Sequence, residues 1–328
     1  MVIDIISSNT KIWNINQVVA DIAELMIRDE NITLDFNFEG PDIAETELCN
    51  LILKLAEAYH YDPKRITIVT ANQVQTHNLF RIEYANPMGL ITSTWRFALE
   101  CEKNINKHFG IFVGRSNAPR LHLASYLYKN YQDQSLITYH FNFARENHLD
   151  NIGLEELVKI FNKSDLTVEA EFLKDCPIVS NKRPKHEHED LDWDQIVPLK
   201  DKRNFVNNYR DIFVELVCET CYSGNTFFPT EKIWRPMLLQ TPFIVQGPRN
   251  FLTRLHDLGF KTFNNWWSES YQLDTPDYQV EVIKEIVKDI SVLSSADLST
   301  MYKEMQPVLE HNKQRLWELS EDDFAKQR

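Results

Sequence analysis

Glycine is scarce in this chain, with 8 residues among 328. The glycine-rich motifs that cradle phosphates or dinucleotides, G-x-G-x-x-G and the Walker loop, do not occur, and neither does the G-x-S-x-G elbow of hydrolases. The sequence therefore predicts no dinucleotide-binding loop of the usual kind and no P-loop nucleotide hydrolysis.

Long apolar runs and an excess of basic residues are also missing. No run of about 18 apolar residues occurs, so we expect no membrane span. The opening residues, MVIDIISSNTKIW, predict a β-strand rather than a signal peptide, and hence a cytoplasmic protein. The formal net charge of −13 disfavours a general nucleic-acid-coating protein, because such proteins bind phosphates with many Lys and Arg.

The 5 cysteines are scattered and odd in number. Cys218 and Cys221 form a C-x-x-C pair, but the chain has no second pair with which they would build a zinc site. We therefore expect free thiols rather than a disulfide framework or a metal centre.

Residues 181–203 form the most charged and least periodic stretch, and we expect a surface loop there. Within it, Asp192-Trp193-Asp194 matches the D-x-D that some glycosyltransferases use for a metal-bound nucleotide. The motif is short and does not follow an apolar strand, so we expect a solvated acidic face and no metal site. The possible ligands are His186, Glu187, His188, Asp190, Asp192 and Asp194.

Strand and helix patterns alternate along most of the chain. Strands that alternate with helices predict an α/β fold with parallel sheets covered on both sides. The alternation of strands and helices begins again near residue 108. This predicts two Rossmann-like domains facing a cleft, at 1–104 and 105–296. A helical region follows at 297–328, with Pro307 as a kink or a restart. Strands are predicted at residues 2–6, 32–38, 65–70, 109–113, 135–141, 212–217 and 242–246.

Two separate segments resemble one known family. Residues 213–263 have the order strand, glutamate, loop, T-E-K at a helix start, helix, strand and glycine. This order resembles the donor-binding half of α1,3-fucosyltransferases and related GT-B sugar transferases, which carry E-N-S at the strand end and a Y-x-T-E-K signature. The corresponding residues here are Glu219-Thr220-Cys221 and Phe228-Pro229-Thr230-Glu231-Lys232.

The second match lies upstream, where the family shows V-S-N and then an arginine at the opening of a helix. This chain has Gly114-Arg115-Ser116-Asn117-Ala118-Pro119-Arg120 after a predicted strand. The resemblance covers residues 109–120 and 213–263, and residues 1–104 show no specific match. Thr220 stands in place of the asparagine and Phe228 in place of the tyrosine, so the sugar and the nucleotide base stay open.

The resemblance implies a GT-B glycosyltransferase that moves a sugar from a GDP- or UDP-sugar to a hydroxyl, most simply on a glycan, without a metal or another cofactor. Residues 1–104 would bind the acceptor and 105–296 the nucleotide-sugar, and 297–328 would pack back on the first domain. The residues that it assigns to donor binding are Arg115, Ser116, Asn117, Arg120, Glu219, Thr220, Thr230, Glu231 and Lys232.

The chemistry of such a donor agrees with these residue types. The leaving group is a nucleoside diphosphate, which requires cations and backbone N–H donors. Arg120 and Lys232 each lie near a predicted helix start, where the helix dipole also favours an anion. Glu219 or Glu231 can accept hydrogen bonds from ribose or sugar hydroxyls.

A catalytic base should deprotonate the acceptor hydroxyl. In parallel α/β sheets, such groups gather at the carboxyl ends of strands. Glu39 and His77 both follow predicted strands of the first domain, and the sequence does not choose between them.

Two other functions stay open. A viral-type DNA glycosyltransferase would use the same donor on a hydroxymethylated base, and a basic loop would face duplex DNA, although the net charge disfavours it. A lectin-like or nucleotide-sugar-binding protein would keep the donor site without turnover. The basic loop would comprise Lys182, Arg183, Lys185, Lys200, Lys202 and Arg203.

Overall fold

The computed structural model describes residues 1–8, 11–12, 14–36, 39–85, 102–113, 118–139 and 207–326. Contacts divide the chain into two compact units that are both discontinuous in sequence. None of the helices in these ranges is long and apolar enough to cross a membrane. The first unit comprises Met1–Pro87, Glu219–Thr230 and Gly247–Arg254, and the second comprises Met88–Cys218, Glu231–Gln246 and Leu255–Arg328.

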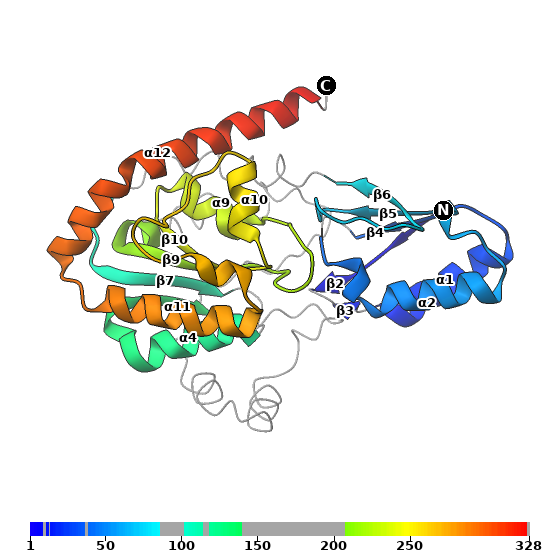
Figure 1. The fold of residues 1–328 in the computed structure, drawn as a ribbon, viewed down its shortest axis with the longest axis horizontal. Coiled ribbons are helices and arrows are strands. Elements are labelled where there is room, and N and C mark those ends of the chain that lie inside the picture. Colours follow the sequence, from blue (N-terminus) through cyan, green and yellow to red (C-terminus); the bar gives the residue numbers. More distant parts are fainter. Residues whose placement is uncertain are drawn as a thin grey trace. The chain divides into compact units, whose positions relative to one another are not determined.

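The first unit contains a parallel four-stranded sheet in the order β1-β4-β5-β6. Helix α1 connects β1 to β4, and α2 connects β4 to β5 (Figure 1). A short antiparallel hairpin, β2-β3, lies between β1 and α1 in the chain. The bounds are β1 Val2–Asp4, β2 Ser7–Ser8, β3 Lys11–Ile12, α1 Ile15–Ile27, β4 Ile32–Asp35, η1 Ile43–Glu45, α2 Glu47–Ala58, η2 Pro63–Arg65, β5 Ile66–Thr70 and β6 Arg81–Tyr84.

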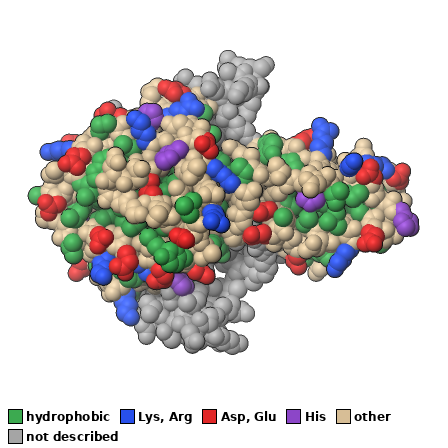
Figure 2. Space-filling view, viewed as in Figure 1, with side chains coloured by type: hydrophobic (Ala, Val, Ile, Leu, Met, Phe, Trp, Pro, Cys, Tyr) green, Lys and Arg blue, Asp and Glu red, His purple; other side chains and the backbone are tan. Residues whose placement is uncertain are grey.

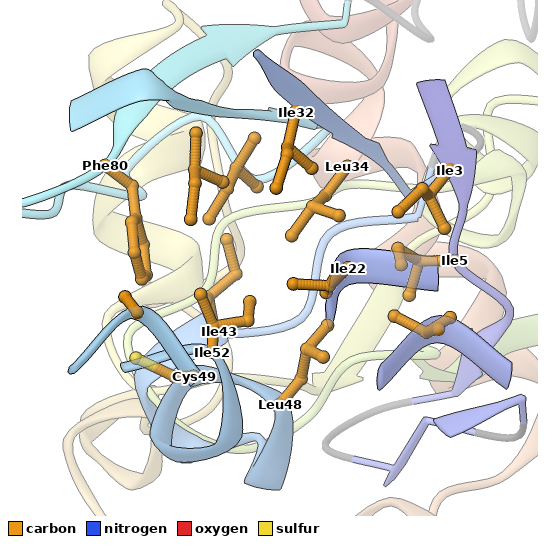
Figure 3. Close-up of a cluster of buried hydrophobic side chains, with 14 of the residues drawn as sticks. Ile3, Ile5, Ile22, Ile32, Leu34, Ile43, Leu48, Cys49, Ile52 and Phe80 are labelled. Atoms are coloured by element: carbon orange, nitrogen blue, oxygen red, sulfur yellow. The ribbon is translucent and has the colours of Figure 1, made fainter. Parts of the chain in front are cut away.

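Alternation along these strands directs one side of the sheet towards the two helices. Ile3, Leu34 and Ile68 are register neighbours on β1, β4 and β5, and all three are buried. They share one apolar cluster with Ile22 of α1 and Ile52 of α2 (Figure 3). Successive strand residues point to opposite sides, so Val2 faces away from this cluster, and it is 59% exposed. The predicted covering of both sides therefore does not extend to this edge strand.

The second unit contains another parallel four-stranded sheet, in the order β10-β9-β7-β8. Helices α4 and α11 pack on each other, and α4 also contacts β7, β8 and β9 (Figure 1). Helix α9 contacts β9, β10 and α12, on the opposite face of the sheet. This sheet is covered on both sides, as predicted for parallel strands. The bounds are β7 Lys107–Val113, α4 Ala118–Tyr131, η3 Gln132–Gln134, β8 Ser135–Tyr139, β9 Ile212–Cys218, α9 Glu231–Leu238, β10 Phe243–Gln246, α10 Phe251–Asp257, η5 Ser270–Leu273, α11 Pro276–Ser291 and α12 Ser295–Lys326.

The predicted α/β class with parallel sheets is confirmed, and each predicted strand has a counterpart. Strand β6 was not predicted, because Ile82 is its one aliphatic residue, flanked by Arg81 and Glu83; such charged, short strands are typical of sheet edges. Helix α12 continues through Pro307 and does not restart there.

The domain boundaries differ in detail from the division at 104/105. The N-terminal stretch of the first unit ends at Pro87, and this unit also takes two later segments of the chain. Within the second unit, α12 packs on α9. The predicted packing of residues 297–328 on the first domain stays a prediction.

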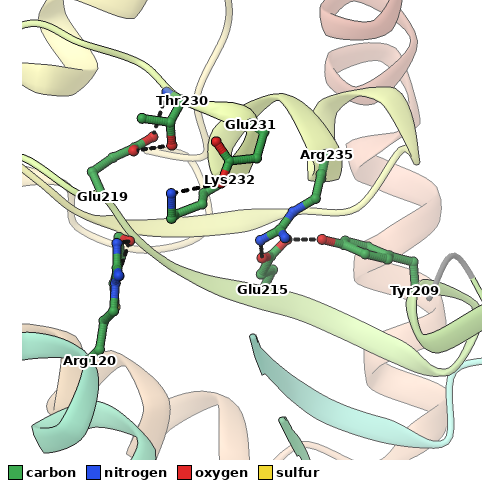
Figure 4. A network of polar contacts seen from close by, with 9 residues as sticks. Arg120, Tyr209, Glu215, Glu219, Thr230, Glu231, Lys232 and Arg235 are labelled. Carbon is green, nitrogen blue, oxygen red and sulfur yellow. Dashed lines mark hydrogen bonds and ion pairs between the residues drawn. The ribbon is translucent and has the colours of Figure 1, made fainter. Parts of the chain in front are cut away.

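A buried charge network ties α9 to β9. Glu215, in the middle of β9, is 1% exposed and pairs with Arg235 of α9 at 3.3 Å. The Tyr209 hydroxyl donates a hydrogen bond to Oε2 of Glu215 at 2.8 Å (Figure 4). Burial raises the pKa of Tyr209 well above its ordinary value, so this hydroxyl keeps its proton. The network holds α9 against the sheet at Arg235, in the last turn of the helix.

We expect Glu215→Gln to destabilise the second unit, because it removes the carboxylate from Arg235 in a buried position. Breaking a buried ion pair from one side costs about 3 kcal/mol or more. Urea unfolding followed by tryptophan fluorescence measures this loss, with Trp234 of α9 as a reporter in the same unit. The matched control is Asp211→Asn in the exposed Arg210–Asp211 pair, for which we expect less than about 1 kcal/mol. Equal losses in the two variants would contradict the assignment.

Candidate functional site

The sheet of the second unit has a switch point between β7 and β9. The chain passes from β7 to β8 on one side, and from β9 to β10 on the other. Ligands of parallel α/β sheets bind in the crevice that this divergence leaves at the carboxyl ends of the strands. Strand β7 ends at Val113 and β9 ends at Cys218, so both fucosyltransferase-like segments begin at this edge.

Arg120 holds the end of β9 in place. Its Nε and Nη2 donate hydrogen bonds to the carbonyl oxygen of Cys218, at 3.2 and 3.0 Å, across 98 positions of sequence (Figure 4). Arg120 lies in the first turn of α4 and is 3% exposed, so its positive charge lies beneath the surface of this edge. A direct contact with a diphosphate stays a prediction. Arg115, Ser116 and Asn117 lie outside the described residues.

Glu219 and Thr230, the two ends of the loop that follows β9, are hydrogen-bonded to each other. The Thr230 hydroxyl donates to Oε2 of Glu219 at 2.5 Å, and the Thr230 N–H donates to Oε1 at 3.3 Å (Figure 4). Glu219 is fully buried, and a buried carboxylate requires such hydrogen bonds. Residues 219–230 therefore form an Ω-loop whose ends are held together. The observed role of Glu219 is to close this loop, and its contact with ribose or sugar hydroxyls stays a prediction.

Glu231 and Lys232 open helix α9 as an ion pair, with Nζ of Lys232 2.8 Å from Oε1 of Glu231 (Figure 4). Burial raises the pKa of Glu231, but the charges of Lys232 and Arg235 outweigh it and hold that pKa at about 2. Glu231 is therefore ionised at neutral pH. A cation at a helix N-terminus is unfavourable on its own, and Glu231 supplies the compensating negative charge within the chain.

Two residues of the family-like motifs, Phe228 and Cys221, belong to one apolar cluster. Phe228, which replaces the tyrosine of Y-x-T-E-K, packs with Ala71 and Cys221, and all three are buried. Cys221 is the last residue of the Glu219-Thr220-Cys221 motif. Thr220, beside them in sequence, is also buried. Phe228 and Cys221 are therefore packing residues of the first unit.

Glu39 lies four residues after the end of β4 in the first unit and is half-buried. Its N–H donates to the Phe36 carbonyl at 2.9 Å, and its carbonyl accepts from the Ala71 N–H at 3.0 Å. The Thr70 hydroxyl also donates to that carbonyl, at 3.4 Å. These contacts hold the Glu39 backbone at the carboxyl edge of the sheet, which is the position expected of a candidate base.

His77 is held by local contacts. Its Nδ1 accepts hydrogen bonds from the N–H groups of Leu79 and Phe80, both at 3.2 Å. We infer from these contacts that the proton lies on Nε2, which is 3.7 Å from Sγ of Cys49. The ring stacks on Phe80 with centroids 4.2 Å apart. The basic lone pair of His77 is therefore directed at its own loop, which favours Glu39 as the candidate base.

Asn72 and Asp42 lie at the carboxyl edge of the first sheet and were not among the predicted site residues. Asn72 lies just after β5, and the side chain of Asp42 caps the short helix η1 by accepting a hydrogen bond from the Ala44 N–H. Asn72 is fully buried and bonded on both sides of its amide. A polar residue directly after a buried strand was the available signal, but its partners lie 153 and 155 positions further along the chain.

Within the described part of the chain, metal ligands do not gather at the ends of these strands. Among the residues that the structure describes, no group of three or more His, Cys, Asp or Glu side chains could hold a metal ion. Cys49, Cys218 and Cys221 are buried and form no disulfide bond with one another. The acidic cluster at residues 186–194 lies outside the described residues.

His77 gives a pH-dependent prediction. Burial lowers the pKa of His77 below its ordinary value of about 6.5. The unfolded chain then binds the proton more readily, so protonation destabilises the fold as the pH falls below about 6.5. We expect the urea midpoint of the wild type to fall more between pH 7.5 and 5.5 than that of His77→Asn, whose amide oxygen can replace Nδ1 as the acceptor. An NMR titration midpoint for His77 at or above 6.5 would contradict this.

The chain was also compared with known proteins. It matches no model of a known protein family, and it matches no curated protein.

Proposed function

We propose that the chain is a metal-independent GT-B glycosyltransferase that transfers a sugar from a nucleoside-diphosphate donor to a hydroxyl group of a glycan. The observation that carries the proposal is the position of Arg120 and Thr230-Glu231-Lys232. The Arg120 segment and the start of the loop that leads to T-E-K follow the two strands that flank the switch point. That edge is where parallel α/β sheets bind nucleotides.

The donor diphosphate would interact with the second unit. Lys232 supplies a cation whose side chain is 16% exposed, at the first turn of α9. Arg120 adds positive charge beneath the same edge, in the first turn of α4. Both helices direct backbone N–H groups towards an anion bound at their N-termini. This combination stabilises a diphosphate leaving group without a divalent cation.

The proposed reaction balances without a redox partner. The acceptor oxygen forms a bond to the anomeric carbon of the donor sugar, while the bond from that carbon to the diphosphate oxygen breaks. The diphosphate leaves with the electron pair of that bond, and a carboxylate takes the proton of the acceptor hydroxyl. Glu39 is our candidate for that base.

The surface charge supports a glycan rather than duplex DNA as the acceptor. On the face shown in Figure 2, acidic and basic side chains are interspersed and do not form an extended basic stripe. Proteins that bind duplex DNA place several Lys and Arg along its phosphates. The net charge of −13 points the same way.

Nucleotide binding without metal tests the donor site. We expect a nucleoside diphosphate, GDP or UDP, to bind equally well in calorimetry with and without EDTA, because Lys232 and the helix N-termini replace the metal. In thermal-shift assays, ligand at 100 times its dissociation constant stabilises the fold by about 2.7 kcal/mol. Binding that is lost on chelation, or no binding of any nucleoside diphosphate, would contradict the proposal. Release of free sugar from the bound donor would separate an enzyme from a lectin-like binder.

Lys232→Ala tests the cation directly. Losing a charge-assisted contact to the leaving group costs about 2 to 4 kcal/mol in the transition state. We therefore expect kcat/KM for donor hydrolysis or transfer to fall roughly 30- to 1000-fold. The Glu231 side chain is 41% exposed, so losing the ion pair should cost less than about 1 kcal/mol of stability.

The matched control is Lys284→Ala. Lys284 forms an ion pair with Glu281 at 2.7 Å and has a similarly covered side chain, but it lies on α11. We expect this variant to keep wild-type kcat/KM. If Lys232→Ala also keeps it, Lys232 is a structural cation and the T-E-K assignment is wrong.

A further inference from the structure

The Ω-loop at residues 219–230 belongs to the first unit, although both of its ends continue into the second. The loop is anchored on residues that follow strands β4 and β5. Its Asn225 N–H donates to Oδ2 of Asp42 at 2.8 Å, and its Phe227 carbonyl accepts from the Gln73 N–H at 3.0 Å. The loop is thus part of the carboxyl edge of the first sheet.

Asn72 contributes the largest set of these anchors. Its Oδ1 accepts from the Phe227 N–H at 2.9 Å and from the Val74 N–H at 3.2 Å. Its Nδ2 donates to the Asn225 carbonyl at 3.1 Å and to Oε1 of Gln75 at 3.2 Å. Asn72 is fully buried, so one amide side chain joins its own loop to the Ω-loop on both its donor and acceptor sides.

Two glycines allow the close approach of the loop. A Cβ atom on Gly40 would lie 2.7 Å from the backbone nitrogen of Asn72 and 2.8 Å from Cβ of Phe228. A Cβ atom on Gly224 would lie 2.7 Å from Cβ of Asp42, and the Gly224 φ of +70° is itself unfavourable for other residues. Both contacts are too short for a side chain, so the loop is packed directly on backbone and short side chains.

A short and stiff connection joins the anchored end of the Ω-loop to Thr230-Glu231-Lys232. Phe227 and Phe228 are held by Asn72 and by the cluster with Ala71. Only Pro229, whose ring fixes φ, separates them from Thr230, which Glu219 holds. Glu231 and Lys232 follow at once. Thr230, the first residue of T-E-K, is therefore held by contacts within the first unit.

We propose that Asn72 is a positioning residue that orders the Ω-loop and, through it, orients Thr230-Glu231-Lys232 for donor binding. The effect on donor binding rests on the proposed function, whereas the ordering of the loop does not. When the loop is loosened, the binding-competent state is less populated, and the apparent affinity falls by that fraction. Saturating donor selects the ordered state again, so KM should rise while kcat changes little.

Hydrogen exchange with mass spectrometry tests the ordering of the loop. In Asn72→Ala we expect peptides within residues 219–232 to exchange at least about tenfold faster, because two backbone hydrogen bonds to the amide are lost. Peptides of β4 and β5 should keep wild-type protection. Gly40→Ala is the second variant, since its Cβ would push on the Asn72 backbone and on Phe228 while the Asn72 amide side chain stays in place.

Asn312→Ala is the matched control. Asn312 is also a buried amide, and it holds the N–H and the carbonyl of Lys261, both at 2.8 Å, but in a different loop. It should loosen residues around Lys261 and leave the affinity for GDP or UDP unchanged. Asn72→Ala should weaken that affinity roughly tenfold and raise the donor KM by a similar factor.

The outcomes separate the two proposals. Unchanged exchange in residues 219–232, or faster exchange spread equally over β4 and β5, would overturn the positioning role. Unchanged nucleotide affinity despite a loosened loop would overturn its effect on the donor site. If the wild type binds no nucleoside diphosphate, the proposed function is wrong, and the exchange experiment alone still decides whether Asn72 orders the loop.

Discussion

The parallel pairing of β7 with β9 is the constraint on which the candidate site depends. Parallel strands end at the same edge of a sheet, so β7 and β9 end side by side, at Val113 and Cys218. Because the order is β10-β9-β7-β8, the strand after β7 lies on one side and the strand after β9 on the other, which makes this the switch point at which parallel α/β sheets bind ligands. Arg120 strengthens this arrangement, since it joins the helix after β7 to the carbonyl at the end of β9.

Several charged groups on β9, in the Ω-loop and on α9 have partners within the chain. Glu219 is bonded to Thr230, Glu231 to Lys232 and Glu215 to Arg235, at separations of 11, 1 and 20 positions. Such pairs remove the cost of burying single charges and also restrict side-chain motion. A donor site built from them would be preorganised, which reduces the ordering that a ligand must impose. The backbone of the Ω-loop is also held by partners within the chain, because it forms hydrogen bonds with Asp42, Asn72 and Gln73 of the first unit.

Sequence patterns predicted the elements better than the roles of individual residues. The strands were predictable because their aliphatic runs are long enough to show a period, whereas β6, with Ile82 between two charges, was not. His77 and Glu39 were equivalent in the sequence. The structure distinguishes them, because Nδ1 of His77 accepts hydrogen bonds from the N–H groups of Leu79 and Phe80 and is therefore occupied. Similarly, Arg120 was predicted near a helix start, but its burial against Cys218 depends on a strand 98 positions away.

The sequence by itself determined the α/β class, the two strand–helix runs and the family-like segments around Arg120 and Thr230-Glu231-Lys232. These features are local, since each depends on side-chain periodicity or on a short motif. The tertiary structure decided that Arg120 lies against the end of β9, that Phe228 and Cys221 are packing residues, and that residues 219–230 join the first unit. Those facts depend on hydrogen bonds and close contacts between distant segments. Asn72 shows why: its amide bonds residues more than 150 positions away, and no local pattern encodes such partners.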